Sequence, residues 1–213
     1  MRKELQKRIL SSIIIAPLSL FFIIKGSIFF ILFLIILFFI ASLEWVKMTK
    51  KIEFQITGIV FLFFSFYSVY FLRENNLLNF LSIILICITT DIGGYVFGKI
   101  FKGPKLSKIS PNKTYSGMIG SYLLSILVFY FFVEKYGSSW IEQNFTKDLM
   151  LVPVVFFISS VSQIGDLIIS YFKRLSKIKN SGNLIPGHGG LLDRIDGMIF
   201  AYPAAYLIYK ILI

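Results

Sequence analysis

The side chains best suited to chemistry lie in one segment, residues 163–197. This segment holds the only histidine of the chain, His188, and three of its eleven carboxylates. Apolar sequence flanks it on both sides, so charge at this density indicates a site rather than a solvated surface. Its basic side chains are Lys173, Arg174, Lys177, Lys179 and Arg194.

The spacing of the three carboxylates favours a shared metal ion. Asp193 and Asp196 are three residues apart, and if residues 191–197 open the last helix, both lie in its first turn, where the helix dipole favours anions. Oxygen ligands in this number suit Mg²⁺ or Mn²⁺, whereas one histidine and one cysteine make a zinc site improbable. We therefore predict that Asp166, Asp193 and Asp196 converge on a metal ion.

Bases and a glycine-rich turn accompany these acids. Ser170 and Lys173 follow Asp166 at helical spacing, so the three side chains share one helix face. Acids that hold a metal, with bases and the N–H groups of turn 187–190 that hold phosphates, suit a metal-bound polyphosphate. His188 has two open roles here: it either binds or protonates a phosphate, or it pins the turn by bonding to the backbone.

A second polar connection, residues 99–116, carries five lysines and ends just before an apolar run. A helix N-terminus with Lys and Ser or Thr beside it is a ready phosphate site, so Ser110, Lys113 and Thr114 are candidate substrate-binding residues. The alternative is that this connection contacts anionic lipid headgroups.

Asp91 lies inside the preceding apolar run, after two threonines. An acidic group at the centre of a bare transmembrane helix is unfavourable by roughly 2.5–3.5 kcal/mol on insertion scales. The position of Asp91 therefore indicates that it faces a polar cleft. The alternative is that it lies near a helix end, where water hydrates its carboxylate.

Long apolar runs must position these residues. The chain of 213 residues is 56% hydrophobic, and several runs approach the roughly 20 residues that cross a bilayer as a helix. The sequence predicts an all-α polytopic membrane protein with one membrane domain, 1–213, whose first forty residues form the N-terminal helices. The first two spans have an alternative as a re-entrant pair. The predicted spans are 9–24, 27–43, 54–72, 77–98, 117–133, 149–170 and 197–213.

Basic residues alternate between the two sides of this layout. The successive connections carry 4, 1, 3, 1, 5, 2 and 5 Lys or Arg residues. The positive-inside rule then places the N-terminus and the connections 99–116 and 171–196 in the cytoplasm. The net charge of +11 is explained by these loops, so it does not predict nucleic acid as a partner.

With these motifs assembled, the chain resembles the phosphatidate cytidylyltransferase (CDP-diacylglycerol synthase) family over about residues 41–213. Two positions depart from the family pattern: Asn180 replaces an Asp, and Ser116 stands where many members carry Glu. Glu44 matches an acidic position more weakly. The matching C-terminal residues are Ser170, Lys173, Arg174, Lys179, Gly182, Ile185, Pro186, His188, Gly189, Gly190, Asp193, Arg194 and Asp196. The matching residues of the earlier stretch are Asp91, Gly94, Tyr95, Gly98, Ser110, Pro111, Lys113, Thr114 and Gly117.

The resemblance implies that CTP and phosphatidate give CDP-diacylglycerol and pyrophosphate, for phospholipid biosynthesis in a bacterial inner membrane. It implies Mg²⁺ as the cofactor, with Mn²⁺ or an additional monovalent cation as alternatives, and a homodimer as in some members. The implied catalytic residues are Asp166, Asp193, Asp196, Lys173, Arg174 and His188, the first three as metal ligands. The implied substrate-binding residues are Asp91, Ser110, Lys113, Thr114, Ser170, Lys179, Gly189, Gly190 and Arg194.

Two other functions remain open at this point. A CTP-dependent polyprenol or lipid kinase would share basic loops and a metal site, and its product, a lipid monophosphate with CDP, would distinguish it. A cation transporter would use Asp91 and Asp166 as an ion path, but it gives no role to the bases around His188.

Overall fold

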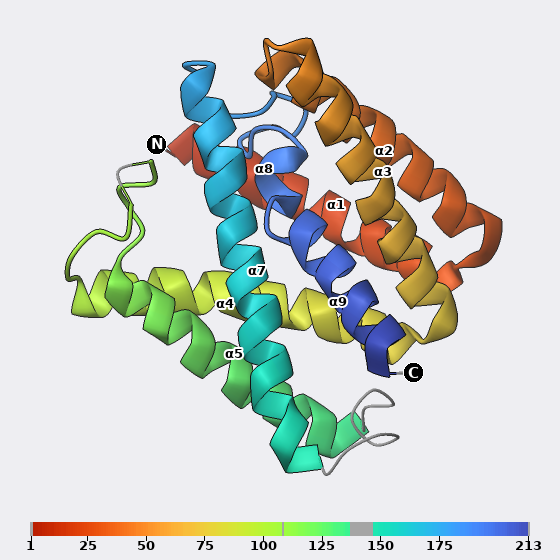
Figure 1. Ribbon diagram of the computed structural model, residues 1–213. Helices are drawn as coiled ribbons and strands as arrows, with labels where there is room; N and C mark the ends of the chain where they lie inside the picture. The colour runs from red at the N-terminus through yellow and green to blue at the C-terminus, as the bar shows by residue number, and fades with distance from the viewer. Residues whose placement is uncertain (1, 108, 137–146, 213) are drawn as a thin grey trace. The chain divides into compact units, whose positions relative to one another are not determined.

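The computed structural model describes residues 2–107, 109–136 and 147–212, and these fold as helices (Figure 1). The described chain forms two compact units, each made of two separate stretches of sequence. Apart from the helices, the described residues form isolated β-bridges only. The predicted all-helical class is confirmed. The prediction of one membrane domain concerns how the two units combine, and it stays a prediction.

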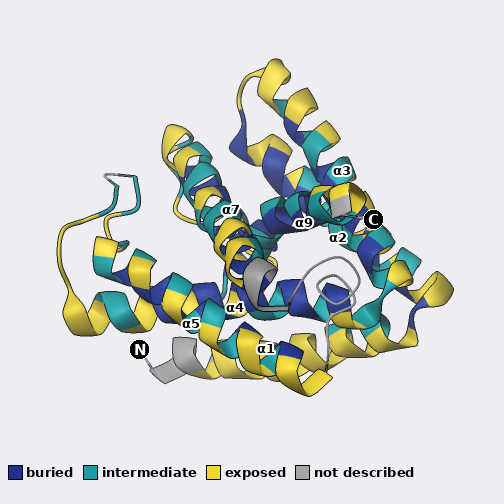
Figure 2. Cartoon of the chain, turned by 60° about the horizontal axis from the view of Figure 1, so that its bottom comes forward, coloured by how far each residue is buried: buried dark blue, intermediate teal, exposed yellow. Residues whose placement is uncertain are grey.

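The first unit comprises Met1–Tyr70 and Phe172–Asp196. Gly26, with φ of 66°, allows the tight turn between its first two helices. Phe22 and Phe33 stack across that turn, with ring centroids 4.9 Å apart, and α1 is exposed along most of its length (Figure 2). Its helices are α1 (Arg2–Lys25), α2 (Ser27–Met48), most of α3 (Ile52–Asn75), the last turn of α7 (Lys147–Leu175) and α8 (Leu192–Ile195).

The second unit comprises Phe71–Tyr171 and Gly197–Ile213. Its helices α4 and α5 lie side by side along much of their length (Figure 1). Asn76 begins α4, because its side chain accepts hydrogen bonds from the N–H groups of Leu78 and Asn79. The helices of this unit are α4 (Leu77–Phe101), α5 (Tyr115–Tyr136), most of α7, and α9 (Met198–Leu212).

Glycines set the close contact between α4 and α5. A Cβ atom added at Gly93 would lie 2.5 Å from the Gly120 carbonyl oxygen, and one added at Gly117 would lie 2.6 Å from the Gly94 carbonyl oxygen. No side chain fits at either position without moving a backbone. These glycines therefore serve helix packing, as small residues do in membrane helices.

Six helices in the described part of the chain are long and apolar enough to cross a membrane, and α9 is a shorter apolar helix that contains Pro203. Both α1 and α2 reach this length, which favours two crossings over a re-entrant pair. The first six predicted spans agree with these helices, although α7 extends to Leu175 and takes Lys173 and Arg174 into its last turn. The seventh predicted span, 197–213, falls on the shorter helix α9. The predicted outer connection, 134–148, lies largely outside the described residues.

One expectation about the last helix is wrong. Residues 191–197 do not open it: Asp193 belongs to the separate short helix α8, and Asp196 lies at the C-cap of that helix. A turn at Asp196 and Gly197 precedes α9. Glycine is a poor helix former, which explains a break at Gly197.

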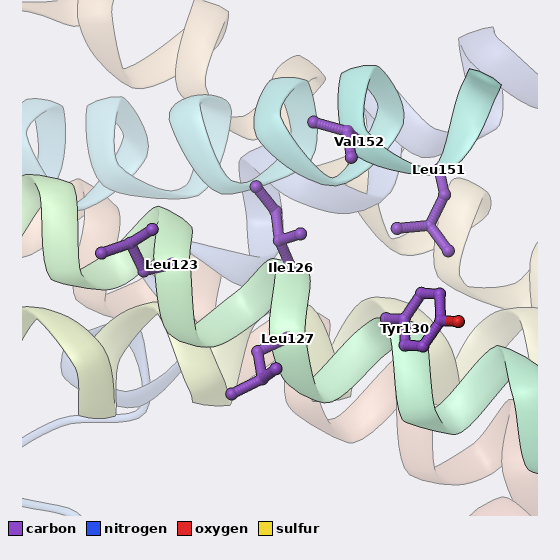
Figure 3. A pocket seen from close by; sticks show the side chains of 6 residues that line it. All are labelled: Leu123, Ile126, Leu127, Tyr130, Leu151 and Val152. Carbon is purple, nitrogen blue, oxygen red and sulfur yellow. The ribbon is translucent and has the colours of Figure 1, made fainter. Parts of the chain in front are cut away.

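An apolar hollow of about 390 Å³ lies between α5 and α7 in the second unit (Figure 3). Side chains such as Leu123, Ile126 and Leu151 line it, with Tyr130 at one side. No Asp, Glu, Lys or Arg is among its lining residues. This hollow is therefore not the place for chemistry on phosphates.

Candidate active site

Glu44 lies buried at the centre of the loop formed by residues 176–191, which we call the signature loop. Its side chain comes from α2, and the residue is only 6% exposed. One carboxylate oxygen accepts the N–H of Leu191 at 2.8 Å, and the other accepts the N–H of Leu192 at 2.9 Å. The Ser181 hydroxyl donates to the second oxygen at 2.8 Å. Glu44 thus joins two distant parts of the loop to α2.

The glycines of the signature loop make room for this carboxylate. A Cβ atom added at Gly190 would lie 2.5 Å from an oxygen of Glu44, and one added at Gly182 would lie 2.7 Å from the other oxygen. Neither position tolerates a side chain while Glu44 stays in place. The spacing of these glycines therefore reflects the acid that they surround.

Lys173 and Asp193 form a second buried anchor in the same unit. The ammonium group lies 2.8 Å from one carboxylate oxygen, and the two side chains are 10% and 8% exposed. The other oxygen of Asp193 accepts the N–H groups of Ser181 at 2.8 Å and Gly190 at 3.0 Å. Asp193 therefore holds α7, two separate parts of the signature loop and α8 together.

These contacts set the ionisation of Asp193. Burial alone would raise the pKa of this carboxyl, but the hydrogen bond from Lys173, the N–H groups of Gly190 and Ser181, and the lysine charge outweigh burial. The pKa of Asp193 therefore lies below its ordinary value. Asp193 is a permanent anion at neutral pH.

The turn around His188 uses its own N–H groups internally. The N–H groups of His188 and Gly189 donate to the Ile185 carbonyl at 2.9 and 3.1 Å, and the N–H of Gly190 donates to Asp193. Gly189 has φ of 93°, a conformation that glycine adopts without strain. These glycines shape the turn, and their predicted contact with a phosphate through the N–H groups stays a prediction.

His188 contacts the first helix. Its Nδ1 lies 2.8 Å from the hydroxyl oxygen of Ser11, and its Nε2 lies 3.4 Å from that of Ser12. Burial lowers the pKa of His188 below its usual range, and the positive charges of Arg194 and Arg8 lower it further. His188 is therefore held mainly neutral at pH 7. Its ring contacts side chains of α1, and the prediction that it pins the turn by bonding to the backbone stays a prediction.

Three predicted phosphate ligands of the first unit are exposed. Lys179 and Arg174 lie at the surface, and Arg174 donates to the Ile178 carbonyl at 3.3 Å. Arg194 is exposed as well and donates to the His188 carbonyl at 2.7 Å. These cations are accessible to an anion, which their predicted role requires.

In the second unit, Lys113 and Asp166 form an ion pair at 2.5 Å, with both side chains 26% exposed. The Ser170 hydroxyl donates to Asp166 at 3.2 Å, one helical turn further along α7, as the spacing predicts. Asp91 on α4 is exposed and interacts electrostatically with both Asp166 and Lys113. The structure thus brings together three predicted site residues from α4, α7 and the connection between α4 and α5.

The connection between α4 and α5 folds back on itself to deliver Lys113. The Leu106 N–H donates to the Lys113 carbonyl at 2.8 Å, and the Lys113 N–H donates to the Ser110 carbonyl at 3.1 Å. Thr114 caps α5, because its hydroxyl oxygen accepts the Gly117 N–H at 3.1 Å. The Ser116 hydroxyl donates to the Lys102 carbonyl. Ser116, one of the two residues that depart from the family pattern, therefore closes the loop. Ser110 therefore positions Lys113, and Thr114 fixes the start of α5 directly after it.

The model of the cytidylyltransferase family matches residues 54–212. The chain belongs to the cytidylyltransferase family. It is accordingly an enzyme of the nucleotidyltransferase kind, as the sequence predicts.

Curated relatives of this cytidylyltransferase agree. A phosphatidate cytidylyltransferase of Rickettsia bellii is 35% identical over 97% of this chain and 91% of its own length. Another, of Rickettsia felis, is 31% identical over 97% of this chain and 93% of its own. One of Staphylococcus epidermidis is 41% identical over 68% of this chain and 52% of its own length. The predicted family is confirmed.

A metal ion can be tested against the carboxylates of each unit. Within neither unit do the described residues form a group of three or more His, Cys, Asp or Glu side chains that could hold a metal ion. In nucleotide enzymes Mg²⁺ is usually bound by one or two carboxylates together with substrate phosphates and water. Asp91 and Asp166 could supply these carboxylates. The predicted set of Asp166, Asp193 and Asp196 spans the two units and stays a prediction.

Several residues that hold the site carry only a weak sequence signal. Glu44 matches the family pattern weakly, although it is the buried anchor of the signature loop. Arg8 and Ser11 belong to a stretch outside the resemblance, yet both contact the turn around His188. A glutamate ending an otherwise apolar run was the available signal for Glu44, and no pattern marked Arg8 or Ser11.

Proposed function

We propose that this enzyme transfers the cytidylyl group of CTP to phosphatidate, giving CDP-diacylglycerol and pyrophosphate. The observation that carries the proposal is the agreement between the family match, which includes the whole signature loop, and relatives named phosphatidate cytidylyltransferase along nearly the full chain. Both substrates are polyanions, and the exposed cations described above suit them.

The reaction needs charge stabilisation more than a strong base. A phosphatidate oxygen, already anionic near neutral pH, attacks the α-phosphorus of CTP, and the bond to the β-phosphate oxygen breaks to release pyrophosphate. Lysine and arginine side chains stabilise the charge that develops on the leaving group. We assign Lys113 in the second unit, and Arg174, Lys179 and Arg194 in the first, to the phosphates of the two substrates. Buried Lys173 holds Asp193 in place.

Mg²⁺ is part of this proposal. When bound, it would neutralise charge on the triphosphate and on the leaving pyrophosphate. Asp166 is the best placed of the predicted ligands, because Asp91 lies near it and its ion pair with Lys113 is partly exposed. Asp193 is more deeply buried against Lys173 and also accepts the N–H groups of Ser181 and Gly190. The variants Asp193→Asn and Asp196→Asn test whether these two acids also bind the metal ion.

We also propose that the protein resides in the bacterial plasma membrane with the signature loop and the connection between α4 and α5 on the cytoplasmic side. The concentration of basic residues in these connections and in the N-terminal tail supports this orientation. CTP is a cytoplasmic solute, so the orientation would give the enzyme its nucleotide. Cysteines placed at Lys179 and Lys102 should react with an impermeant maleimide only in inverted vesicles.

The test is a direct assay of the lipid product. Purified protein in detergent is given phosphatidate, CTP labelled at the α-phosphorus, and Mg²⁺, and the lipid fraction is separated by chromatography. Label should enter the lipid, and EDTA should abolish the transfer. Asp166→Asn should abolish it as well, whereas Glu53→Gln, an exposed acid at the start of α3, should retain it.

Further outcomes separate the roles of the acids and the rival reaction. Asp193→Asn and Asp196→Asn are assayed together with their thermal stability, so that loss of a metal ligand is distinguished from loss of folding. Absence of labelled lipid from folded wild-type protein would contradict the proposal. CTP labelled at the γ-phosphorus with a polyprenol would then test a lipid kinase.

A further inference from the structure

The turn that carries His188 is completed by α1, which lies outside the residues matched by the family model. Ser11 is only 7% exposed. Its hydroxyl oxygen lies 2.8 Å from Nδ1 of His188, 3.0 Å from the Arg8 carbonyl oxygen and 3.1 Å from the Pro186 carbonyl oxygen. A buried hydroxyl with this many partners fixes the direction of its hydrogen bonds.

The acceptors around Ser11 favour one tautomer of His188. A hydroxyl has one proton to donate, and a carbonyl oxygen can only accept, whereas Nδ1 either donates or accepts. Two carbonyl oxygens lie within reach of the Ser11 hydroxyl, and donation to either of them leaves the hydroxyl oxygen as an acceptor for Nδ1. In that arrangement Nδ1 carries the proton and Nε2 carries the lone pair.

The backbone around His188 is held at several points. Arg8 donates from Nε to the Gly187 carbonyl at 2.8 Å, and Arg194 donates to the His188 carbonyl at 2.7 Å. The His188 N–H donates to the Ile185 carbonyl at 2.9 Å. The ring then presents Nε2 in one direction. The Ser12 hydroxyl approaches this nitrogen at the long distance of 3.4 Å.

We propose that Ser11 and Arg8 are positioning residues that hold neutral His188 with Nδ1 protonated, so that Nε2 accepts the proton of the phosphate monoester headgroup of the lipid substrate. The inference rests on the proposed function. Phosphate monoesters lose their second proton near pH 6, so part of the lipid is still monoprotonated at neutral pH. Arg8 on α1 and Arg194 on α8, the charged groups acting on the ring, both oppose its prior protonation.

The step balances as a proton transfer followed by substitution. The proton of the phosphate hydroxyl passes to Nε2 and leaves a dianion, which is the better nucleophile. A phosphatidate oxygen then bonds to the α-phosphorus of CTP as pyrophosphate leaves, and the imidazolium returns its proton to water. Ser11 and Arg8 touch neither substrate and act only through His188 and its turn.

Nitrogen NMR tests the positioning without any assay of activity. His188 is the only histidine of the chain, so protein labelled with ¹⁵N-histidine gives a single pair of ring signals. At neutral pH the wild type should show Nδ1 protonated and Nε2 unprotonated. Ser11→Ala should give a mixture of tautomers, Ser11→Thr should restore the single tautomer, and Ser19→Ala, roughly two turns further along α1, should leave it unchanged. An Nε2-protonated wild type, or a Ser11→Ala spectrum identical to the wild type, would overturn the proposal.

Steady-state kinetics tests the consequence for the reaction. Because only the monoprotonated lipid needs the base, Ser11→Ala and Arg8→Met should lower kcat by about 10-fold one pH unit below the phosphate pKa near 6 and by little above pH 7, while the KM for CTP stays the same. Ser11→Thr should recover most of kcat. An unchanged kcat at this lower pH in folded Ser11→Ala would refute the role of the hydroxyl, and an equal loss in Ser11→Thr would assign Ser11 to packing. Failure of the wild type to make CDP-lipid would refute the proposed function, while the NMR result would still decide the positioning.

Discussion

The ammonium group of Lys173 lies 2.8 Å from a carboxylate oxygen of Asp193, and both side chains are nearly excluded from solvent. Lys173 lies in the last turn of α7 and Asp193 lies in α8, so this pair joins the helices on either side of the signature loop. The second oxygen of Asp193 is held by two backbone N–H groups of the loop. An acid that the sequence marks as a metal ligand is therefore also a structural anchor.

Breaking this ion pair should destabilise the protein. Lys173→Met leaves the buried carboxylate of Asp193 without its counter-charge, which reduces the free energy of unfolding by about 3–5 kcal/mol. Thermal unfolding in detergent measures the loss. The double variant Lys173→Met with Asp193→Leu should be more stable than either single variant, because no unpaired charge remains buried. Single variants as stable as the wild type would contradict the anchoring role.

The low pKa of Asp193 predicts how stability depends on pH. Because the folded-state pKa lies below the ordinary 3.8, the stabilisation is fully present above that value and is lost as pH falls through the folded-state pKa. The stability advantage of the wild type over Asp193→Asn should therefore be constant above about pH 5 and shrink progressively as the pH falls below about 4 and through the folded-state pKa. Thermal scans of both proteins across this range provide the measurement. A stability difference between the two proteins that stays constant with pH would show that the charge of Asp193 is not its source.

Glu44 should be required for the signature loop. Glu44→Ala removes the acceptor of the Leu191 and Leu192 N–H groups, and each buried N–H without a partner is unfavourable by about 1–3 kcal/mol. Hydrogen exchange should show faster exchange at these two amides, and cytidylyl transfer should fall. Glu53→Gln, an exposed change at the start of α3, is the control. Amides that stay protected in Glu44→Ala would show that the loop is held by other contacts.

The contact between α4 and α5 should not tolerate a methyl group. Gly93→Ala places Cβ 2.5 Å from the Gly120 carbonyl oxygen, and the strain should lower stability by about 1–3 kcal/mol. Ile92→Ala is the matched control, because this neighbouring side chain is 48% exposed. Thermal unfolding in detergent compares the two. Equal effects at both positions would argue against the close packing.

Lys113 should matter for activity more than for stability. Its ion pair with Asp166 is partly exposed, so Lys113→Met should change the free energy of unfolding by at most about 1 kcal/mol. If Lys113 binds the phosphates of CTP, kcat/KM for CTP should fall by roughly 100-fold. Lys113→Arg should retain part of it. A normal kcat/KM in Lys113→Met would remove this residue from the proposed site.

Several features could be read directly from the sequence. Apolar runs of membrane-spanning length predicted the helices, since a helix in lipid must satisfy its own backbone and this demand acts locally. Helical spacing placed Ser170 one turn after Asp166, and their hydrogen bond confirms it. The motif around His188 was sufficient for the family, because its residues are close together in the chain.

The contacts that hold the site were decided by the tertiary structure alone. Glu44 meets Ser181 across 137 residues, and Ser11 meets His188 across 177. A single serine or glutamate in an apolar helix carries no periodic signal, because its partner is fixed by packing between distant segments. The glycine turn shows the same limit: its composition predicted N–H groups close to a phosphate but not their partners within the fold, where Ile185 and Asp193 accept the N–H groups of His188, Gly189 and Gly190. Local sequence therefore determined the helices and the family motif, and long-range hydrogen bonds determined how that motif is shaped.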